Sequence, residues 1–318
     1  MNGSRRDFVV TSVGGGLAMA AGASADAKPK EKQVDRRTLG RIGAEVSIYG
    51  LGLGSAFFKP MAGNPDGASA MLERALDFGI NYWDTARSYD GSEELIGPVL
   101  EKRRKEVFMV SKSGEKTYDT FMKELEASLK SLRTDHLDLY LMHNWQPKKG
   151  DTSPAARDGA YKAAVKAREQ GMIKAFGVTG HSGPDILMEC IKAFDPDALL
   201  TTFPANRPEN GRYEDELLPL AVENNMGVIA MKTVRHVRNS DQKPSELIRY
   251  ALSLPGVSTA IVGTGEVPHV EANAELATNF RAMDEMNRKS LSKKVAMNIP
   301  TGLPQPWDLP GYEDGMLA

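Results

Sequence analysis

The chain has 318 residues, with 40 basic and 42 acidic side chains and a formal net charge of −2. This balance favours neither nucleic acid nor an anionic membrane as a partner, so the expected partner is a small neutral or weakly charged substrate. A hydrophobic fraction of 41% is that of a soluble globular protein with a large core. The single cysteine, Cys190, excludes an intramolecular disulfide, cannot build a zinc site by itself, and is expected to pack inside a helix.

Residues 1–27 are expected to be an export signal. Arg5 and Arg6 stand ahead of a run rich in Gly, Ala and Val, which ends in the small-residue pattern of residues 25–27. The arrangement resembles a twin-arginine signal peptide, and the run is too short for the roughly 20 residues of a membrane span. We therefore expect export to the periplasm or the exterior by the twin-arginine machinery, with no stable membrane association after processing. A cytoplasmic tail that carries Arg-Arg by chance is the alternative, and residues 28–36 are expected to be a solvated charged linker.

Eight short segments have the composition of buried β-strands. Each is rich in β-branched and aromatic residues and is followed by a turn and an amphipathic segment. Near-continuous apolar strands that alternate with helices are typical of a parallel sheet covered by those helices. The predicted strands are residues 46–55, 80–86, 107–114, 137–144, 173–180, 198–206, 227–234 and 257–263.

The segments between these strands have helical periodicity. Within residues 117–133, the apolar residues from Phe121 to Leu132 recur every three or four positions and so line one face of a helix. The predicted helices are residues 66–79, 92–103, 117–133, 157–170, 183–194, 213–225, 243–254 and 267–278.

Eight such units close most simply into a single α/β domain, a (β/α)8 TIM barrel over residues 37–297. A doubly wound open sheet is the alternative, but the stretch GLGLGSAFF lacks the third glycine of its usual turn and is followed by KPMAGNPDG instead of a helix. RRTLGRIGAEVS, residues 36–47, predicts an N-terminal β-hairpin that closes the N-terminal mouth. The irregular C-terminal tail, residues 298–318, is rich in Pro and Gly and is either disordered or draped over the barrel.

Polar side chains recur where the predicted strands end, which is where barrels of this kind place their reacting groups. A lysine there can pair with Asp84, and its charge lowers the pKa of a neighbouring tyrosine from about 10 towards neutrality. Such a phenol can protonate a carbonyl oxygen, which a histidine can orient. No metal site or thiolate is expected to supply the electron pair, so a hydride-donating cofactor completes the reaction. The candidates are Ser55 after the first strand, Asp84 and Tyr89 after the second, Lys112 after the third and His143 after the fourth.

Residues 37 to about 280 resemble an aldo/keto reductase. The resemblance lies in three stretches in order on successive strands: NYWDTARSYDGSEELIG, VSKSG and SLKSLRTDHLDLYLMHNW. It implies a (β/α)8 barrel that binds NADPH in extended form without a Rossmann motif and passes hydride to an aldehyde or ketone, or the reverse. The family's tetrad maps onto Asp84, Tyr89, Lys112 and His143, with Tyr89 as the general acid or base.

VGTGEVPHVEANAELA, residues 262–277, resembles the family's adenosine-phosphate segment. His269 stands where an Arg commonly grips the 2′-phosphate, and Glu266 adds a negative charge. Because bidentate guanidinium contacts are lost, selection for a 2′-phosphate is weakened, and NADP(H) and NAD(H) both stay open as the cofactor. The cofactor residues that the resemblance implies in this region are Gly263, Thr264, Gly265, His269 and Asn273.

Other departures from the family pattern fall near the nicotinamide. Thr179 and Gly180 replace a Ser-Asn pair, and Thr201 falls where a Gln is usual. Met231-Lys232 stands where many members have an aromatic residue, and Lys232 either reaches a phosphate or lies in solvent. The remaining cofactor residues implied by the resemblance are Gly54, Ser55, Thr179, Gly180, Thr201, Met231 and Lys232, and the expected substrate-binding residues are Phe57 and Trp145.

Two other function classes stay open. A barrel enzyme can use Lys112 or Lys232 to form a Schiff base with a carbonyl substrate. A protein that binds or senses the nicotinamide cofactor can keep the barrel and turn over little.

Overall fold

A computed structural model describes residues 31–147, 150–181 and 183–299 of the chain. Eight parallel strands close into a barrel, in which each strand pairs with the next and β10 pairs with β3. The predicted (β/α)8 barrel is therefore confirmed. The alternative of an open sheet is wrong, because an open sheet has two unpaired edge strands, whereas here β10 and β3 pair with each other. The strands are β3 (Tyr49–Gly52), β4 (Tyr82–Asp84), β5 (Phe108–Ser113), β6 (Leu137–Trp145), β7 (Ile173–Gly180), β8 (Ala198–Thr202), β9 (Gly227–Met231) and β10 (Val257–Gly263).

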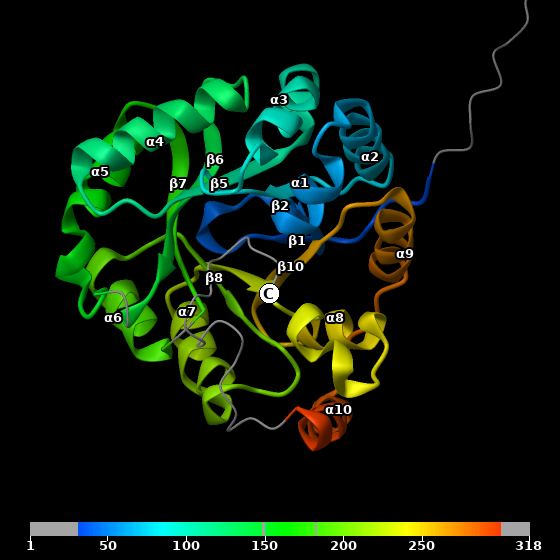
Figure 1. Ribbon diagram of the computed structural model, residues 1–318. Coiled ribbons are helices and arrows are strands. Elements are labelled where there is room, and N and C mark those ends of the chain that lie inside the picture. The colour runs from blue at the N-terminus through cyan, green and yellow to red at the C-terminus, as the bar shows by residue number, and fades with distance from the viewer. Residues whose placement is uncertain (1–30, 148–149, 182, 300–318) are drawn as a thin grey trace, which may run out of the picture. The chain divides into compact units, whose positions relative to one another are not determined.

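The helices form a ring around these strands (Figure 1). In α4 the predicted apolar face is buried at Phe121 and Leu125, and Thr117 caps the helix by accepting a hydrogen bond from the amide of Thr120. Cys190 is buried within α6, as expected. The helices that follow the predictions are α2 (Pro65–Asp77), α3 (Ser92–Arg103), α4 (Tyr118–Ser131), α5 (Asp158–Glu169), α6 (Pro184–Phe194), α7 (Leu218–Glu223) after a π-helical turn over Tyr213–Leu217, α8 (Pro244–Leu252) and α9 (Val267–Thr278).

Two helices differ from the predictions. Helix α1 (Ser55–Met61) begins shortly after β3, in a stretch expected to be a loop, and it contains Pro60. Because proline has no amide hydrogen, α1 lacks the helical hydrogen bond that this residue would otherwise donate. Helix α10 (Glu285–Asn298) follows α9 and buries only Leu291 and Val295. None of the helices in the described part of the chain is long and apolar enough to cross a membrane.

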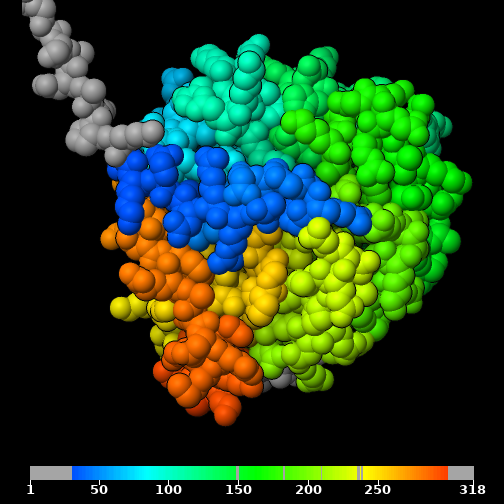
Figure 2. Space-filling view, turned by 180° about the vertical axis from the view of Figure 1, so that it is seen from behind, coloured from blue at the N-terminus to red at the C-terminus, as the bar shows by residue number. Residues whose placement is uncertain are grey.

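The predicted N-terminal hairpin closes the end of the barrel opposite to the C-terminal ends of the strands. Strands β1 (Arg36–Thr38) and β2 (Glu45–Ser47) are antiparallel, and this segment runs across the face seen in Figure 2. Leu39, at the turn, is fully buried with the side chains that fill the barrel interior. A Cβ on Gly40 would lie 2.2 Å from the main chain of Met226, so the turn sits directly against the barrel.

Residues 31–35, part of the expected charged linker, contact the outside of the barrel, although Lys32, Gln33 and Asp35 are exposed. Glu31 forms an ion pair with Arg74 of α2, and Lys32 donates a hydrogen bond to Asn279. Val34 is buried, and its amide donates to the main chain of Phe78. This segment is therefore bound to the outside of the barrel. The predicted signal peptide and most of the predicted tail lie outside the described residues.

Candidate active site

A buried ion pair joins two neighbouring strands at the C-terminal end of the barrel. Asp84 is the last residue of β4, and Lys112 lies near the end of β5. Lys112 Nζ is 2.6 Å from Asp84 Oδ1 and donates a second hydrogen bond, also of 2.6 Å, to the main-chain oxygen of Thr85. Because strand side chains alternate, Lys112 shares the inward side of β5 with Val110, which belongs to the interior cluster.

Tyr89 and His143 complete the group of four residues that the sequence predicted. The ammonium of Lys112 lies 5.2 Å from the centre of the Tyr89 ring. The imidazole of His143, from β6, meets the Tyr89 ring edge-on, with 5.8 Å between ring centres and 79° between their planes. Tyr89 is the most exposed of the four, at 9%, so a phenol stands at the outer side of a buried charged pair.

A second tyrosine lies deeper in the barrel. Tyr82, in β4, is fully buried and stacks on Phe108. Its burial, together with the negative charge of Asp84, raises the pKa of the Tyr82 phenol well above its ordinary value. Tyr82 therefore stays protonated near neutral pH, whereas Tyr89 is the tyrosine whose ring faces the ammonium of Lys112.

The outer side of β5 carries a polar network that sequence reasoning missed. Ser111 donates a 2.7 Å hydrogen bond to Glu93 of α3, and Arg87 forms an ion pair with the same carboxylate. Burial raises the pKa of Glu93 despite these partners. The amide of Arg87 also donates to the main-chain oxygen of Lys112, so the network holds the backbone of the lysine strand.

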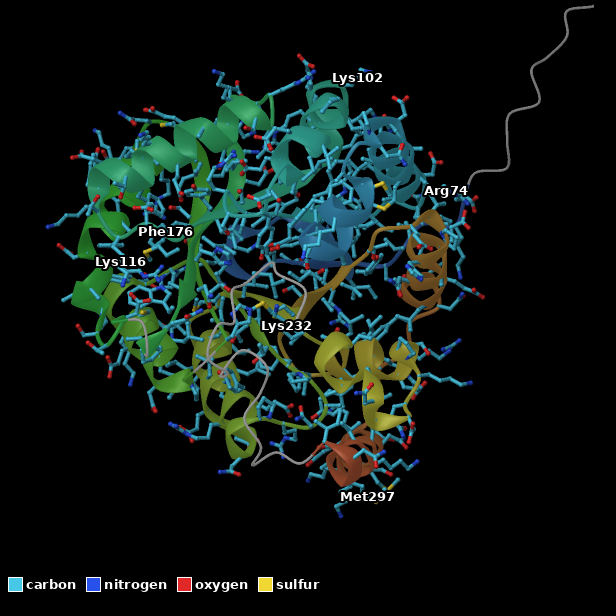
Figure 3. The ribbon with its side chains drawn as sticks, in the orientation of Figure 1. Arg74, Lys102, Lys116, Phe176, Lys232 and Met297 are labelled. Atoms are coloured by element: carbon cyan, nitrogen blue, oxygen red, sulfur yellow. The ribbon has the colours of Figure 1, made fainter. Side chains whose placement is uncertain are left out.

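The residues expected near the nicotinamide lie at the ends of β7, β8 and β9. Thr201 donates a 2.9 Å hydrogen bond to the main-chain oxygen of Gly180, so its hydroxyl links β8 to β7. Met231 ends β9 and contributes to the interior cluster. Lys232 follows in a left-handed conformation, with φ of 59°, and Figure 3 places it within the ring of helices near the barrel axis.

Three buried residues beside them have polar atoms that need partners. In the parts of the chain that the structure describes, the hydroxyls of Thr202 and Thr233 and both amide atoms of Asn206 have no hydrogen-bond partner. Thr202 pairs with Met231 across β8 and β9, so at least two of these groups flank Lys232. A buried polar group without a partner is costly, and a polar ligand or water would satisfy it. The rule that selected Lys112 and His143, polar residues at strand ends, could have found both threonines.

The segment after β10 is brought against α1 and β3. The Thr264 hydroxyl lies 2.9 Å from the hydroxyl of Tyr49, to which Asn273 also donates, so two expected cofactor residues are tied to one buried phenol. A Cβ on Gly265 would lie 2.1 Å from the main-chain oxygen of Ala56. His269, by contrast, is exposed in the first turn of α9.

The remaining predicted residues fall around α1 and β6. Ser55 is the first residue of α1, and a Cβ on Gly54 would lie 3.3 Å from the Tyr89 ring. Phe57 and Trp145, the expected substrate-binding residues, are fully buried in the large hydrophobic cluster between strands and helices. We therefore assign neither of them a contact with substrate.

Comparison with known proteins gives matches that span most of the chain. The model of the Aldo/keto reductase family matches residues 50–238. The uncharacterized oxidoreductase YqkF of Bacillus subtilis is 24% identical over 317 residues, covering 83% of this chain and 97% of that protein. L-galactose dehydrogenase of Arabidopsis thaliana is 24% identical over 314 residues, covering 84% and 95%. The structure of an aldo-keto reductase from Klebsiella pneumoniae in complex with NADPH shares the fold, with a TM-score of 0.69 and 21% identity over 85% of this chain and 97% of that one.

Proposed function

We propose that this chain, which belongs to the aldo/keto reductase family and is an NAD(P)H-dependent oxidoreductase acting on carbonyl compounds, uses Tyr89 as its proton donor and acceptor. The observation that carries the proposal is the placement of the Tyr89 ring beside an ammonium that is itself held by a buried carboxylate. Reduction of a carbonyl needs one hydride and one proton, and the phenol is suited to supply the proton.

The four residues have separate roles in this proposal. Asp84 fixes Lys112, and the charge of Lys112 stabilises the phenolate that Tyr89 becomes after giving up its proton. His143, whose ring meets Tyr89 edge-on, orients the carbonyl oxygen toward the phenol. In the oxidative direction the phenolate takes the proton of the alcohol, so the same groups serve both directions.

The cofactor, when bound, supplies or accepts the hydride. The residues present fit a nicotinamide dinucleotide, because the buried hydroxyls of Thr202 and Thr233, which have no hydrogen-bond partner in the described part of the chain, flank Lys232. We propose that Lys232 binds a phosphate oxygen and that the strand ends bind the nicotinamide half. The residues after β10 would bind the adenosine half. The NADPH carried by the Klebsiella relative supports this class of cofactor. The proposed contacts are Gly54, Ser55, Thr179, Gly180, Thr201, Met231, Lys232, Gly263, Thr264, Gly265, His269 and Asn273.

Tyr89→Phe tests the catalytic assignment. Fluorescence titration with NADPH and NADH would measure cofactor binding, and a panel of aldehydes, ketones and aldoses, run in both directions, would measure turnover. The panel includes aldoses because one relative is a dehydrogenase of L-galactose. We expect the variant to bind cofactor like the wild type and to lose at least about a hundredfold in kcat, the usual scale of general acid–base catalysis.

Tyr118→Phe is the matched control, since Tyr118 is 39% exposed on α4. It should keep full activity. Wild-type turnover in Tyr89→Phe would overturn the assignment. Tight cofactor binding without turnover of any compound in the panel would favour a low-turnover binding or sensing protein.

A Schiff base at Lys112 receives no support from the geometry. Its ammonium donates to a carboxylate and to a main-chain oxygen, whereas a Schiff-base lysine must act as a neutral nucleophile. Borohydride trapping with a carbonyl compound, followed by mass spectrometry, should yield no adduct at Lys112. An adduct there would contradict the proton-transfer assignment.

We propose in addition that residues 1–27 direct export through the twin-arginine route. The support is the sequence alone, with Arg5 and Arg6 ahead of a Gly- and Ala-rich run. Cell fractionation of the full chain should show a processed form outside the cytoplasm. Arg5→Lys combined with Arg6→Lys should retain the unprocessed chain inside, and equal export of this variant would contradict the proposal.

A further inference from the structure

Strand β6 carries one extra residue beside the proposed site. Met142 pairs with Val178 and Trp145 pairs with Gly180, so three steps along β6 match two along β7. Asn144, within this bulge, has a left-handed φ of 54°. A bulge redirects neighbouring side chains, and a non-glycine residue with positive φ needs surrounding contacts to hold it. His143 lies inside the bulge, so its direction depends on what holds the turn.

The buried guanidinium of Arg157 contacts this turn. Arg157 ends the short helical turn Pro154–Arg157, and it donates 2.6 Å and 3.3 Å hydrogen bonds to the main-chain oxygens of His143 and Asn144. Only 3% of the residue is exposed. The guanidinium also lies over the Trp145 ring, 4.8 Å from its centre. One side chain therefore contacts three consecutive residues of the bulge.

Asp151 holds the guanidinium from the other side. Its two oxygens accept from Arg157 at 3.2 Å and 2.7 Å, and the carboxylate also accepts from the amide of Gln146 at 3.0 Å. Lys116, labelled in Figure 3, adds an ion pair of 2.8 Å. A buried ion pair is tolerated when hydrogen bonds satisfy both partners, and this pair meets that condition. Its geometry is therefore well fixed.

The side chain of Asn144 fixes the bulge to the next strand. Asn144 Oδ1 lies 2.8 Å from Nδ1 of His181, just past β7, and the main-chain oxygen of His181 accepts a hydrogen bond of 2.7 Å from Tyr213. The turn is thus held on one side by Arg157 through the backbone and on the other by His181 through a side chain.

We propose that Arg157 is a positioning residue that, with Asp151, sets the direction of the His143 imidazole toward Tyr89, an inference that rests on the proposed role of His143. The guanidinium fixes the peptide plane between His143 and Asn144, and with it the bond that leads to the imidazole. Displacement of a catalytic group by about 1 Å costs roughly a hundredfold in rate. Arg157 thus acts through His143 and touches neither substrate nor cofactor.

The test compares Arg157→Lys and Arg157→Ala with a matched arginine. Arg168 of α5 also pairs with an aspartate, Asp197, and lies over an aromatic ring, Phe176, which Figure 3 labels at the side of the barrel. Both Arg157 variants should lose about ten- to a hundredfold in kcat with little change in KM or in cofactor binding. Millimolar guanidinium should restore part of kcat to Arg157→Ala alone, and Arg168→Lys should behave as wild type.

Asp151→Asn covers the case in which Arg157→Ala does not fold, because it keeps an acceptor for the Gln146 amide. It should lower kcat in the same direction as Arg157→Lys. The ring-proton NMR signals of His143 should shift in Arg157→Lys and in Asp151→Asn but not in Arg168→Lys. Unchanged His143 signals and unchanged kcat in these variants would overturn the proposal.

The NMR readout separates this inference from the proposed function. If Tyr89→Phe keeps wild-type turnover, the proposed function fails, while the His143 signals still report whether Arg157 sets the position of the imidazole. If Tyr89→Phe is inactive and Arg157→Lys leaves the His143 signals and kcat at wild-type values, only the positioning role fails.

Discussion

Lys112 Nζ lies 2.6 Å from Asp84 Oδ1, with 2% and 4% of the two side chains exposed. Neither charge can be hydrated by bulk water in this position, so each depends on the other. The pair is also coupled to Thr85 and to Tyr89. Stability and the catalysis proposed above therefore depend on the same contact. The strength of that contact is measured by changing each partner singly and both together.

Asp84→Asn and Lys112→Met should each reduce the free energy of unfolding by about 3–5 kcal/mol, because each leaves one buried charge without its partner. The double variant should lose clearly less than the sum, since it buries no charge. Urea unfolding of all four proteins measures the coupling. The exposed pair Arg133 and Glu101, 3.1 Å apart, is the control and should show a coupling of about 0–1 kcal/mol. Additive losses at the buried pair would contradict this prediction.

Glu93 and Glu94 should respond to pH with opposite sign. Burial raises the pKa of Glu93, so the native state holds its proton more tightly and stability falls as pH rises through the native pKa. For Glu94, partial burial works in the raising direction, but hydrogen bonds from Ser131 and Arg87 lower its pKa overall. Its contribution is therefore present at neutral pH and is lost as pH falls through the native pKa.

Urea unfolding of Glu93→Gln and Glu94→Gln between about pH 3 and pH 8 checks this pair, since glutamine does not titrate and the lowered pKa of Glu94 lies in the acid part of this range. Relative to wild type, Glu93→Gln should gain stability as pH rises, and Glu94→Gln should lose it. Each variant serves as the control for the other, because they are adjacent and carry the same change. If the stability difference from wild type changed with pH in the same direction for both variants, burial would not be what sets the pKa of Glu93.

Much of the barrel could be predicted because its signals are local. Apolar, β-branched runs such as residues 227–234 predict buried strands, and helices such as α4 carry their own periodic face. Helix α1 was missed because Pro60 and the short length resemble a loop. Helix α10 was missed because only Leu291 and Val295 are buried, so its periodicity is weak. Residues 31–35 contact α2 and the end of α9, which lie far from them in the sequence, so no local pattern indicates these contacts.

The residues of the proposed site also divide into those that a local sequence pattern indicates and those that it does not. Asp84, Tyr89, Lys112 and His143 could be predicted together because each lies just after or within a strand end, and the structure brings all four into one group. Arg157 could not, because its partners are main-chain oxygens 13 and 14 positions earlier in the chain. Burial of Phe57 was also missed, since its place in a helix decides which way it points.

Leu39 and Gly227 should be coupled at the closed end of the barrel. Leu39→Ala should cost about 2–5 kcal/mol of unfolding free energy, because it removes a fully buried side chain from the barrel interior. A Cβ on Gly227 would lie 2.6 Å from Leu39 Cγ, so Gly227→Ala alone should also destabilise the protein. In the double variant the alanine at 227 gains room, and the loss measured by urea unfolding should be smaller than the sum.

The kcat of carbonyl reduction is a second measurement on the Leu39 and Gly227 variants. Leu39 lies at the end of the barrel opposite to Tyr89, so kcat of the folded protein should stay near the wild-type value in all three variants. A large loss of kcat in Leu39→Ala would show that the packing of the closed end reaches the opposite mouth.

His269→Arg should raise the affinity for NADPH about tenfold while leaving NADH binding nearly unchanged. His269 is exposed in the first turn of α9, where helix amides already favour an anion, and arginine adds a planar pair of donors suited to phosphate. One charge-assisted hydrogen bond contributes about 1.5–3 kcal/mol, enough for a change of this size. The gain should shrink with added salt, because the site is open to solvent.

Fluorescence titration with both cofactors measures the effect of His269→Arg. Met286→Arg on α10 is the control, since Met286 is 75% exposed and the change adds one positive charge away from α9. It should leave the ratio of NADPH to NADH affinity unchanged. If His269→Arg also leaves that ratio unchanged, the 2′-phosphate does not bind at the first turn of α9. The adenosine half would then have to be assigned to another part of the mouth.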